Sequence, residues 1–133
     1  MMTDKKSIVA VDDSGIILKM LEKLLGEEYA YSGFSKGMRA LKYLKEAQPP
    51  DLIILDIEMP EIDGYAMLDM IRKKDELKEV PVLFLTSNNG KEDVVKAIKA
   101  GVNDYIVKPI DENVFMDKVR KILKEEKYSW DNV

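Results

Sequence analysis

The stretch LIILDIEMPEIDG, residues 52–64, begins like the interior of a protein and ends like its surface. Four apolar residues lead directly into Asp56, and more acidic residues follow close behind. A short run this apolar is typical of a strand that is buried on both faces of a parallel sheet. A carboxylate at the end of such a strand needs a cationic partner, because an unpaired buried charge is costly.

The apolar pattern on either side of this stretch alternates between two periods. Short runs rich in β-branched residues are separated by segments whose apolar residues recur at helical spacing. Five strands interleaved with five helices indicate an α/β fold with a parallel sheet covered on both faces. The expected strands are 7–13, 30–34, 51–56, 80–87 and 104–109, and the expected helices are 14–26, 37–48, 64–74, 91–101 and 111–127.

Length and composition indicate one globular domain. The chain has 133 residues, of which 46% are hydrophobic and 35% charged, and this is a usual size and balance for a single core. No apolar run approaches the roughly 18 residues that a membrane helix needs, and the N-terminus does not resemble a signal peptide. We therefore expect a cytoplasmic protein without membrane association. The net charge of −4 argues against direct nucleic-acid binding.

The sequence contains no cysteine and no histidine. Disulfides, thiol nucleophiles, thiolate or histidine metal sites and serine-histidine triads are therefore excluded. Any chemistry must use carboxylates, hydroxyls, lysines, backbone groups or a hard cation.

Four of the five expected strands end on a polar or ionic side chain. These side chains are Asp12 with Asp13, Asp56, Thr86 and Lys108. In an open parallel sheet, ligands bind beyond the carboxyl ends of the strands, near the point where strand order reverses. The sequence therefore predicts one cluster of three carboxylates, one hydroxyl and one ammonium group.

This set of groups suits phosphoryl transfer to a carboxylate. Neighbouring carboxylates repel one another, and Mg²⁺ relieves that repulsion while still binding phosphate oxygens. Lys108 offers a point charge and Thr86 a hydroxyl donor for phosphoryl oxygens, with Asp56 as the nucleophile. Each residue alone also fits an ordinary role as a helix cap or a turn, so the interpretation depends on their joint occurrence.

Four motifs together resemble the receiver domain of response regulators, the phosphoacceptor module of two-component signalling. The motifs are V-D-D at 11–13, L-D-I-E-M-P-E-I-D-G at 55–64, L-T-S at 85–87 and D-Y-I-V-K-P at 104–109. They follow the family's order and spacing and cover nearly the whole chain. The resemblance implies a flavodoxin-like (βα)5 three-layer sandwich with the strand order 2-1-3-4-5.

The resemblance also implies the roles of the acidic residues. Asp56 is the expected site of phosphorylation, and Mg²⁺ is the expected cofactor. Asp12 and Asp13 would hold the ion together with Asp56, Asp13 directly. The backbone carbonyl of Glu58, rather than its side chain, would complete the set of protein ligands.

Three further residues are assigned to the switch by the resemblance. Thr86 would bind the phosphoryl group and move on activation, and Lys108 would pair with that group. Tyr105 would turn inward when Thr86 moves. The family pattern further implies a cis peptide bond between Lys108 and Pro109.

The expected function is that of a switch rather than an enzyme. A histidine kinase or histidine phosphotransfer protein would phosphorylate the receiver domain, residues 1–127, with residues 128–133 as a C-terminal tail or the start of a linker. Phosphorylation would alter a surface formed by residues 91–101, 104–109 and 111–127. This surface would bind a downstream protein target or an output domain.

By analogy, the residues two positions after Asp56 and two after Thr86 flank the path of attacking water. Here they are Glu58 and Asn88, and we expect their substitution to change the lifetime of the phosphoryl group more than it changes folding. Glu61 is expected to be only a solvated loop residue, as is Asp63.

Two other functions share part of this pattern. A Mg²⁺-dependent aspartyl-phosphate phosphatase also uses a strand-end aspartate and a lysine, but it usually places a second aspartate where Glu58 stands. A flavin-binding module shares the sheet order, but the VDDSGI loop at residues 11–16 would repel its phosphate.

Overall fold

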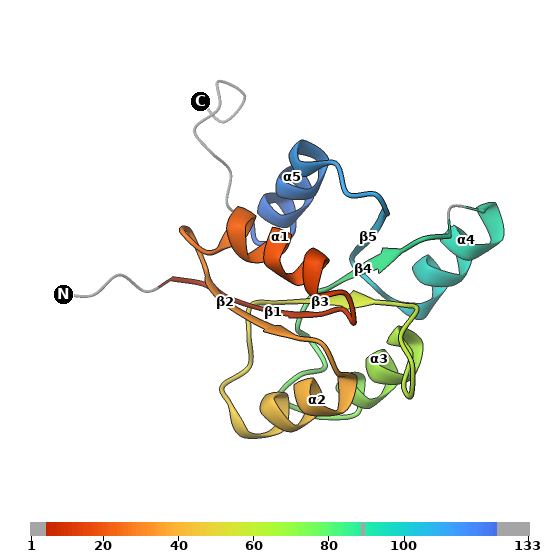
Figure 1. Cartoon of the computed structure of the whole chain (residues 1–133). Helices are drawn as coiled ribbons and strands as arrows, with labels where there is room; N and C mark the ends of the chain where they lie inside the picture. The colour runs from red at the N-terminus through yellow and green to blue at the C-terminus, as the bar shows by residue number, and fades with distance from the viewer. Residues whose placement is uncertain (1–4, 89, 125–133) are drawn as a thin grey trace.

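A five-stranded parallel sheet forms the centre of the protein, with the order β2-β1-β3-β4-β5 (Figure 1). A computed structural model gives the structure of residues 5–88 and 90–124. The strands are β1 Ser7–Val11, β2 Ala30–Phe34, β3 Leu52–Asp56, β4 Val82–Thr86 and β5 Asp104–Val107. The helices are α1 Gly15–Leu25, α2 Gly37–Glu46, α3 Gly64–Arg72, α4 Lys91–Ala100 and α5 Glu112–Ile122.

The helices lie in two layers, α1 and α5 on one face of the sheet and α2, α3 and α4 on the other (Figure 1). Successive residues of a strand point to opposite faces, so every central strand contributes to two cores. In β3, Ile53 and Leu55 pack with the α2, α3 and α4 side, whereas Leu52 and Ile54 pack with α1 and α5. The expected flavodoxin-like three-layer fold is confirmed.

Short polar side chains begin three of the helices at the carboxyl edge of the sheet. Ser14, Asp63 and Asp111 each accept a hydrogen bond from the backbone N–H three residues later. Such N-caps satisfy donors that the first turn of a helix leaves unpaired. Asp63 is therefore more than the solvated loop residue expected from the sequence.

The last helix is shorter than its apolar pattern indicates. Helix α5 ends at Ile122 instead of continuing to residue 127, and Lys124 has a left-handed backbone with φ of 57°. This conformation cannot continue a right-handed helix. The expected tail at 128–133 lies outside the described residues. Among the described residues, no helix is long and apolar enough to cross a membrane.

Candidate functional site

Two buried carboxylates and one lysine meet at the carboxyl edge of the sheet. Asp12 follows β1 and Asp56 ends the adjacent β3, and their exposed fractions are 0% and 1%. Lys108 follows β5, and its Nζ lies 3.0 Å from Asp12 Oδ2 and 3.3 Å from Asp56 Oδ1. The peptide bond between Lys108 and Pro109 is cis, as expected. The cationic partner required by the buried Asp56 is therefore present within the chain.

Backbone groups hold both carboxylates in place. Asp12 Oδ1 accepts a hydrogen bond from Ser14 N–H at 2.9 Å, and Asp56 Oδ1 accepts one from Glu58 N–H at 3.2 Å. The first residue of α3 also approaches the end of β3 closely, because a Cβ on Gly64 would lie 2.8 Å from the carbonyl oxygen of Asp56. Only glycine avoids that overlap. Gly64 therefore allows the start of α3 to pack closely against the backbone of Asp56.

The surroundings raise the pKa of both Asp56 and Lys108. The pKa of Asp56 is raised to about 7, first by burial and then by the neighbouring charge of Asp12, while Lys108 and the Glu58 N–H oppose the rise. Burial alone would lower the pKa of Lys108, but the close, oppositely charged carboxylates of Asp12 and Asp56 raise it overall. One ammonium group thus compensates two buried carboxylates only in part.

The carboxylates offer a suitable set of ligands for a hard divalent cation. One oxygen from each of Asp12, Asp13 and Asp56 lies within 4.8 Å of the others. Asp56 Oδ2 is buried and has no hydrogen-bond partner among the described residues. Within the described part of the chain, Asp12 Oδ2 contacts Lys108 as an ion pair and has no hydrogen-bond partner. Oxygen ligands of this kind fit Mg²⁺. The carboxylate oxygens that lack hydrogen-bond partners could coordinate such an ion.

The loop after β4 contacts the side chain of Glu58. Glu58 Oε2 accepts hydrogen bonds from the Thr86 hydroxyl at 3.0 Å and from the Asn88 side-chain amide at 3.4 Å. Its other oxygen, Oε1, accepts one from Ser87 N–H at 3.1 Å. By analogy with the family, Glu58 and Asn88 were expected to flank the path of attacking water. The hydrogen bond between Glu58 and Thr86 was not predicted.

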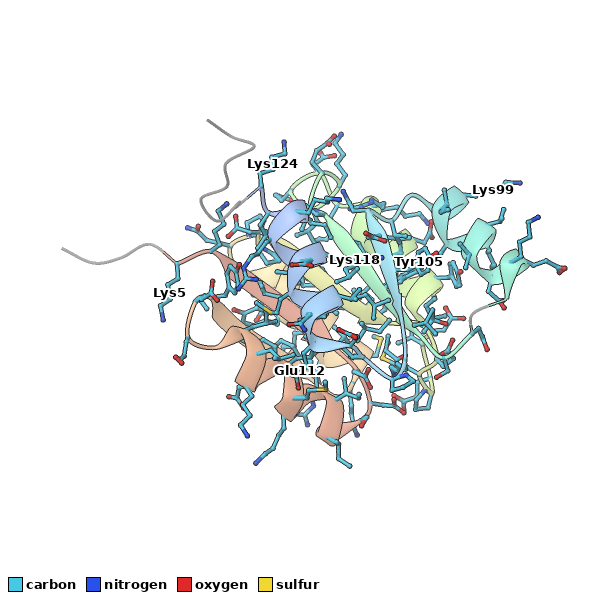
Figure 2. All side chains as sticks on the ribbon, turned by 90° about the horizontal axis from the view of Figure 1, so that it is seen from above. Lys5, Lys99, Tyr105, Glu112, Lys118 and Lys124 are labelled. Atoms are coloured by element: carbon cyan, nitrogen blue, oxygen red, sulfur yellow. The ribbon has the colours of Figure 1, made fainter. Side chains whose placement is uncertain are left out.

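Tyr105 of β5 lies beside Lys118 of α5 (Figure 2). Lys118 Nζ is 5.1 Å from the centre of the Tyr105 ring and donates hydrogen bonds to Asp104 Oδ1 at 2.9 Å and to Tyr105 O at 3.0 Å. The half-buried Tyr105 also packs against the core on the side of α4. Lys118 therefore holds the backbone and the ring of Tyr105, a contact that the sequence pattern did not indicate.

The arrangement as a whole joins buried acids, a lysine and a strand-end hydroxyl at one edge of a 2-1-3-4-5 sheet. Residues 8–120 match the family model described as the response regulator receiver domain. The chain belongs to the response regulator receiver domain family. As a receiver domain it is a module of two-component signalling, in a family that uses Mg²⁺ and interacts with histidine kinases and downstream targets.

Individual relatives agree with this assignment. The receiver domain is 35% identical over 119 residues to the transcriptional regulatory protein AfsQ1 of Streptomyces coelicolor, covering 89% of this chain and 51% of that protein. It is 32% identical over 119 residues to the chemotaxis protein CheY1 of Helicobacter pylori, covering 87% and 95%. The chain thus spans about half of the first relative and nearly all of the second.

Two solved structures give the same result for the fold. A putative response regulator from Chloroflexus aurantiacus aligns with a TM-score of 0.84 and 30% identity, covering 91% of the receiver domain and 99% of that chain. The chemotaxis protein CheY4 of Vibrio cholerae aligns with a TM-score of 0.83 and 26% identity, covering 90% and 99%. The family and the fold are therefore supported independently by sequence and by structure.

Proposed function

We propose that Asp56 of this receiver domain accepts a phosphoryl group from a histidine kinase or a histidine phosphotransfer protein in a Mg²⁺-dependent reaction. The observation that carries the proposal is the asymmetry of its carboxylate. Oδ1 is held by the Glu58 N–H and by Lys108, whereas the buried Oδ2 has no hydrogen-bond partner among the described residues. A carboxylate fixed through one oxygen presents the other as a nucleophile.

In the proposed reaction, an Asp56 oxygen attacks the phosphorus of the donor's phosphohistidine. A P–O bond forms, the P–N bond breaks, and the imidazole of the donor leaves with the bonding electron pair and takes up a proton from water. Lys108 lies within 3.3 Å of Asp56 Oδ1 and offsets the negative charge that gathers at the acceptor. The reaction thus needs no acid or base from this chain beyond positioned charges.

The proposed Mg²⁺ ligands are Asp12, Asp13, Asp56 and the backbone carbonyl of Glu58. When bound, the ion would neutralise the clustered carboxylates and the phosphoryl oxygens, which permits an anionic nucleophile to approach an anionic donor. Asp12 and Asp56 are already fixed by backbone hydrogen bonds, so little reorganisation of their side chains is needed.

The switch is proposed to run from Thr86 to Tyr105. A phosphoryl group on Asp56 offers new acceptors for the Thr86 hydroxyl, and β4 and β5 are neighbours in the sheet, with Thr86 paired to Val107. Movement of Thr86 would let Tyr105 turn inward and change the surface of α4, β5 and α5. That surface would bind a downstream protein target or an output domain, without direct contact to nucleic acid.

The proposal is tested with a small phosphodonor such as acetyl phosphate and Mg²⁺, followed by intact-mass measurement. We expect the wild-type chain to gain one phosphoryl group and Asp56→Asn to gain none. The matched control is Glu61→Gln, which removes one negative charge from the loop after β3 and should be phosphorylated like the wild type. No gain in the wild type would contradict the proposal, and continuous turnover of an added phosphoester would favour a phosphatase.

A further inference from the structure

The carboxylate of Glu58 binds the same hydroxyl that phosphorylation is proposed to use. Thr86 is 5% exposed, and its hydroxyl lies 3.0 Å from Glu58 Oε2. The adjacent Ser87 N–H donates to Glu58 Oε1 at 3.1 Å. Both oxygens of one carboxylate therefore bind two consecutive residues at the end of β4.

Counting hydrogens shows that the Thr86 hydroxyl is fully used. A hydroxyl has one hydrogen to donate, and an ionised carboxylate can only accept. The Thr86 hydroxyl donates its single hydrogen to Glu58 Oε2, and its oxygen accepts the backbone N–H of Asn88 at 3.0 Å. In this arrangement Thr86 has no hydrogen left to donate to a phosphoryl oxygen.

We propose that Glu58 is a positioning residue that holds Thr86 and Ser87 in the unphosphorylated arrangement and competes with the phosphoryl group for them. This inference rests on the proposed phosphorylation of Asp56. A phosphoryl group and the Glu58 carboxylate are both negative, so they repel one another and cannot share the same donors. Phosphorylation must therefore displace the Glu58 carboxylate. The stability of the hydrogen bonds from Thr86 and Ser87 to Glu58 then sets part of the affinity for the phosphoryl group.

Glu58 thus has two separable roles in this domain. Its backbone belongs to the proposed metal site, whereas its side chain turns away to the loop after β4. A side-chain substitution leaves the backbone N–H that binds Asp56 in place. This separation makes the proposed hold testable without removing the proposed metal site.

The first experiment measures amide hydrogen exchange of Ser87 by NMR in the unphosphorylated protein. Glu58→Ala removes the acceptor of the Ser87 N–H, so we expect exchange of that amide to accelerate about three- to tenfold. Glu58→Gln keeps a side-chain oxygen and should restore part of the protection. The control Glu61→Gln removes the same charge from the loop, and no hydrogen bond among the described residues joins Glu61 to Ser87. Unchanged exchange in Glu58→Ala overturns the proposal.

The second experiment measures the affinity for beryllium trifluoride with Mg²⁺ by calorimetry. This phosphoryl mimic is not hydrolysed, so the result does not depend on how Glu58 affects attacking water. We expect Glu58→Ala to bind it about three- to tenfold more tightly than the wild type, the range that one lost competing hydrogen bond gives.

A double-mutant cycle separates the hold on Thr86 from simple charge repulsion. Thr86→Val removes the hydroxyl, so Glu58→Ala in that background should improve affinity by less than about twofold. An equal gain in both backgrounds would assign the effect to charge alone and overturn the proposal. If the wild type binds no beryllium trifluoride, the proposed phosphorylation fails, and the exchange of Ser87 still decides whether Glu58 holds the loop.

Discussion

The two halves of the strand-end site hold their polar groups in opposite ways. The acid half consists of Asp12, Asp56 and Lys108, whose contacts are buried and charged. The loop half consists of Glu58 and its hydrogen bonds to residues 86–88, most of which are exposed. Buried charges are costly to separate, whereas exposed hydrogen bonds exchange readily with water. We therefore expect the acid half to stay fixed and the loop half to be the part that rearranges on phosphorylation.

The largest expected effect comes from removing the cation of the acid half. In Lys108→Met, Asp12 and Asp56 stay buried without compensation, so we expect the free energy of unfolding at pH 8 in EDTA to fall by about 2–3 kcal/mol. Urea denaturation followed by circular dichroism measures this. Lys36→Met is the matched control, because Lys36 is exposed just before α2 and its loss should cost less than about 0.5 kcal/mol. Equal losses in both variants would show that the acid half is not electrostatically strained.

An intermediate effect is expected from removing the charge of Asp56. The pKa of this carboxyl is raised to about 7 in the folded protein by burial and by Asp12, above an ordinary value near 4. The folded state therefore binds more protons than the unfolded state between about pH 4 and 7, and metal-free stability falls as the pH rises through that window.

Asn cannot ionise. We therefore expect Asp56→Asn to leave the free energy of unfolding unchanged near pH 4 and to raise it by about 1–3 kcal/mol at pH 8 in EDTA. Saturating Mg²⁺ should reduce this gain, since a bound cation compensates the same charge. Thermal or urea unfolding across the pH range measures it, with Glu61→Gln as the charge control. A gain that is independent of pH would contradict the raised pKa of Asp56.

The smallest effect on stability is expected in the loop half. Glu58→Gln and Asn88→Ala should each change the free energy of unfolding by less than about 0.5 kcal/mol, because both side chains are exposed. They should nevertheless change the lifetime of the phosphoryl group about three- to tenfold. We expect Glu58→Gln to lengthen it, since the repulsion between Glu58 and the phosphoryl group is removed. Dephosphorylation followed by intact mass measures this, and unchanged lifetimes in both variants would refute the rate-tuning role.

The core of the site was predictable because it depends on topology. Parallel strands end at one edge of the sheet, so polar residues at 12, 56 and 108 had to lie near one another once the alternation of strands and helices was recognised. Their ion pairs confirm that juxtaposition. The chemical roles of these residues remain proposals that the phosphodonor experiment tests.

Other contacts were not predictable because they depend on side-chain direction. Glu58 was expected to offer its backbone carbonyl to the metal and to flank the path of attacking water, but only the tertiary structure shows that its carboxylate binds the loop after β4. Lys118 lies 13 residues after Tyr105, yet the packing of α5 on the sheet brings it over the ring. The apolar pattern also continued past the true end of α5, since periodicity does not report a left-handed residue such as Lys124.

The sequence by itself determined the sheet, its two cores and the edge at which the polar residues meet. These features follow from hydrophobic periodicity and from residue order, which are properties of the chain. Only the tertiary structure decided how the charges share their partners: which oxygen of Asp56 is left without a hydrogen bond, and that Glu58 binds Thr86. Such choices depend on distances of about 3 Å between residues far apart in sequence, and no one-dimensional pattern contains those distances.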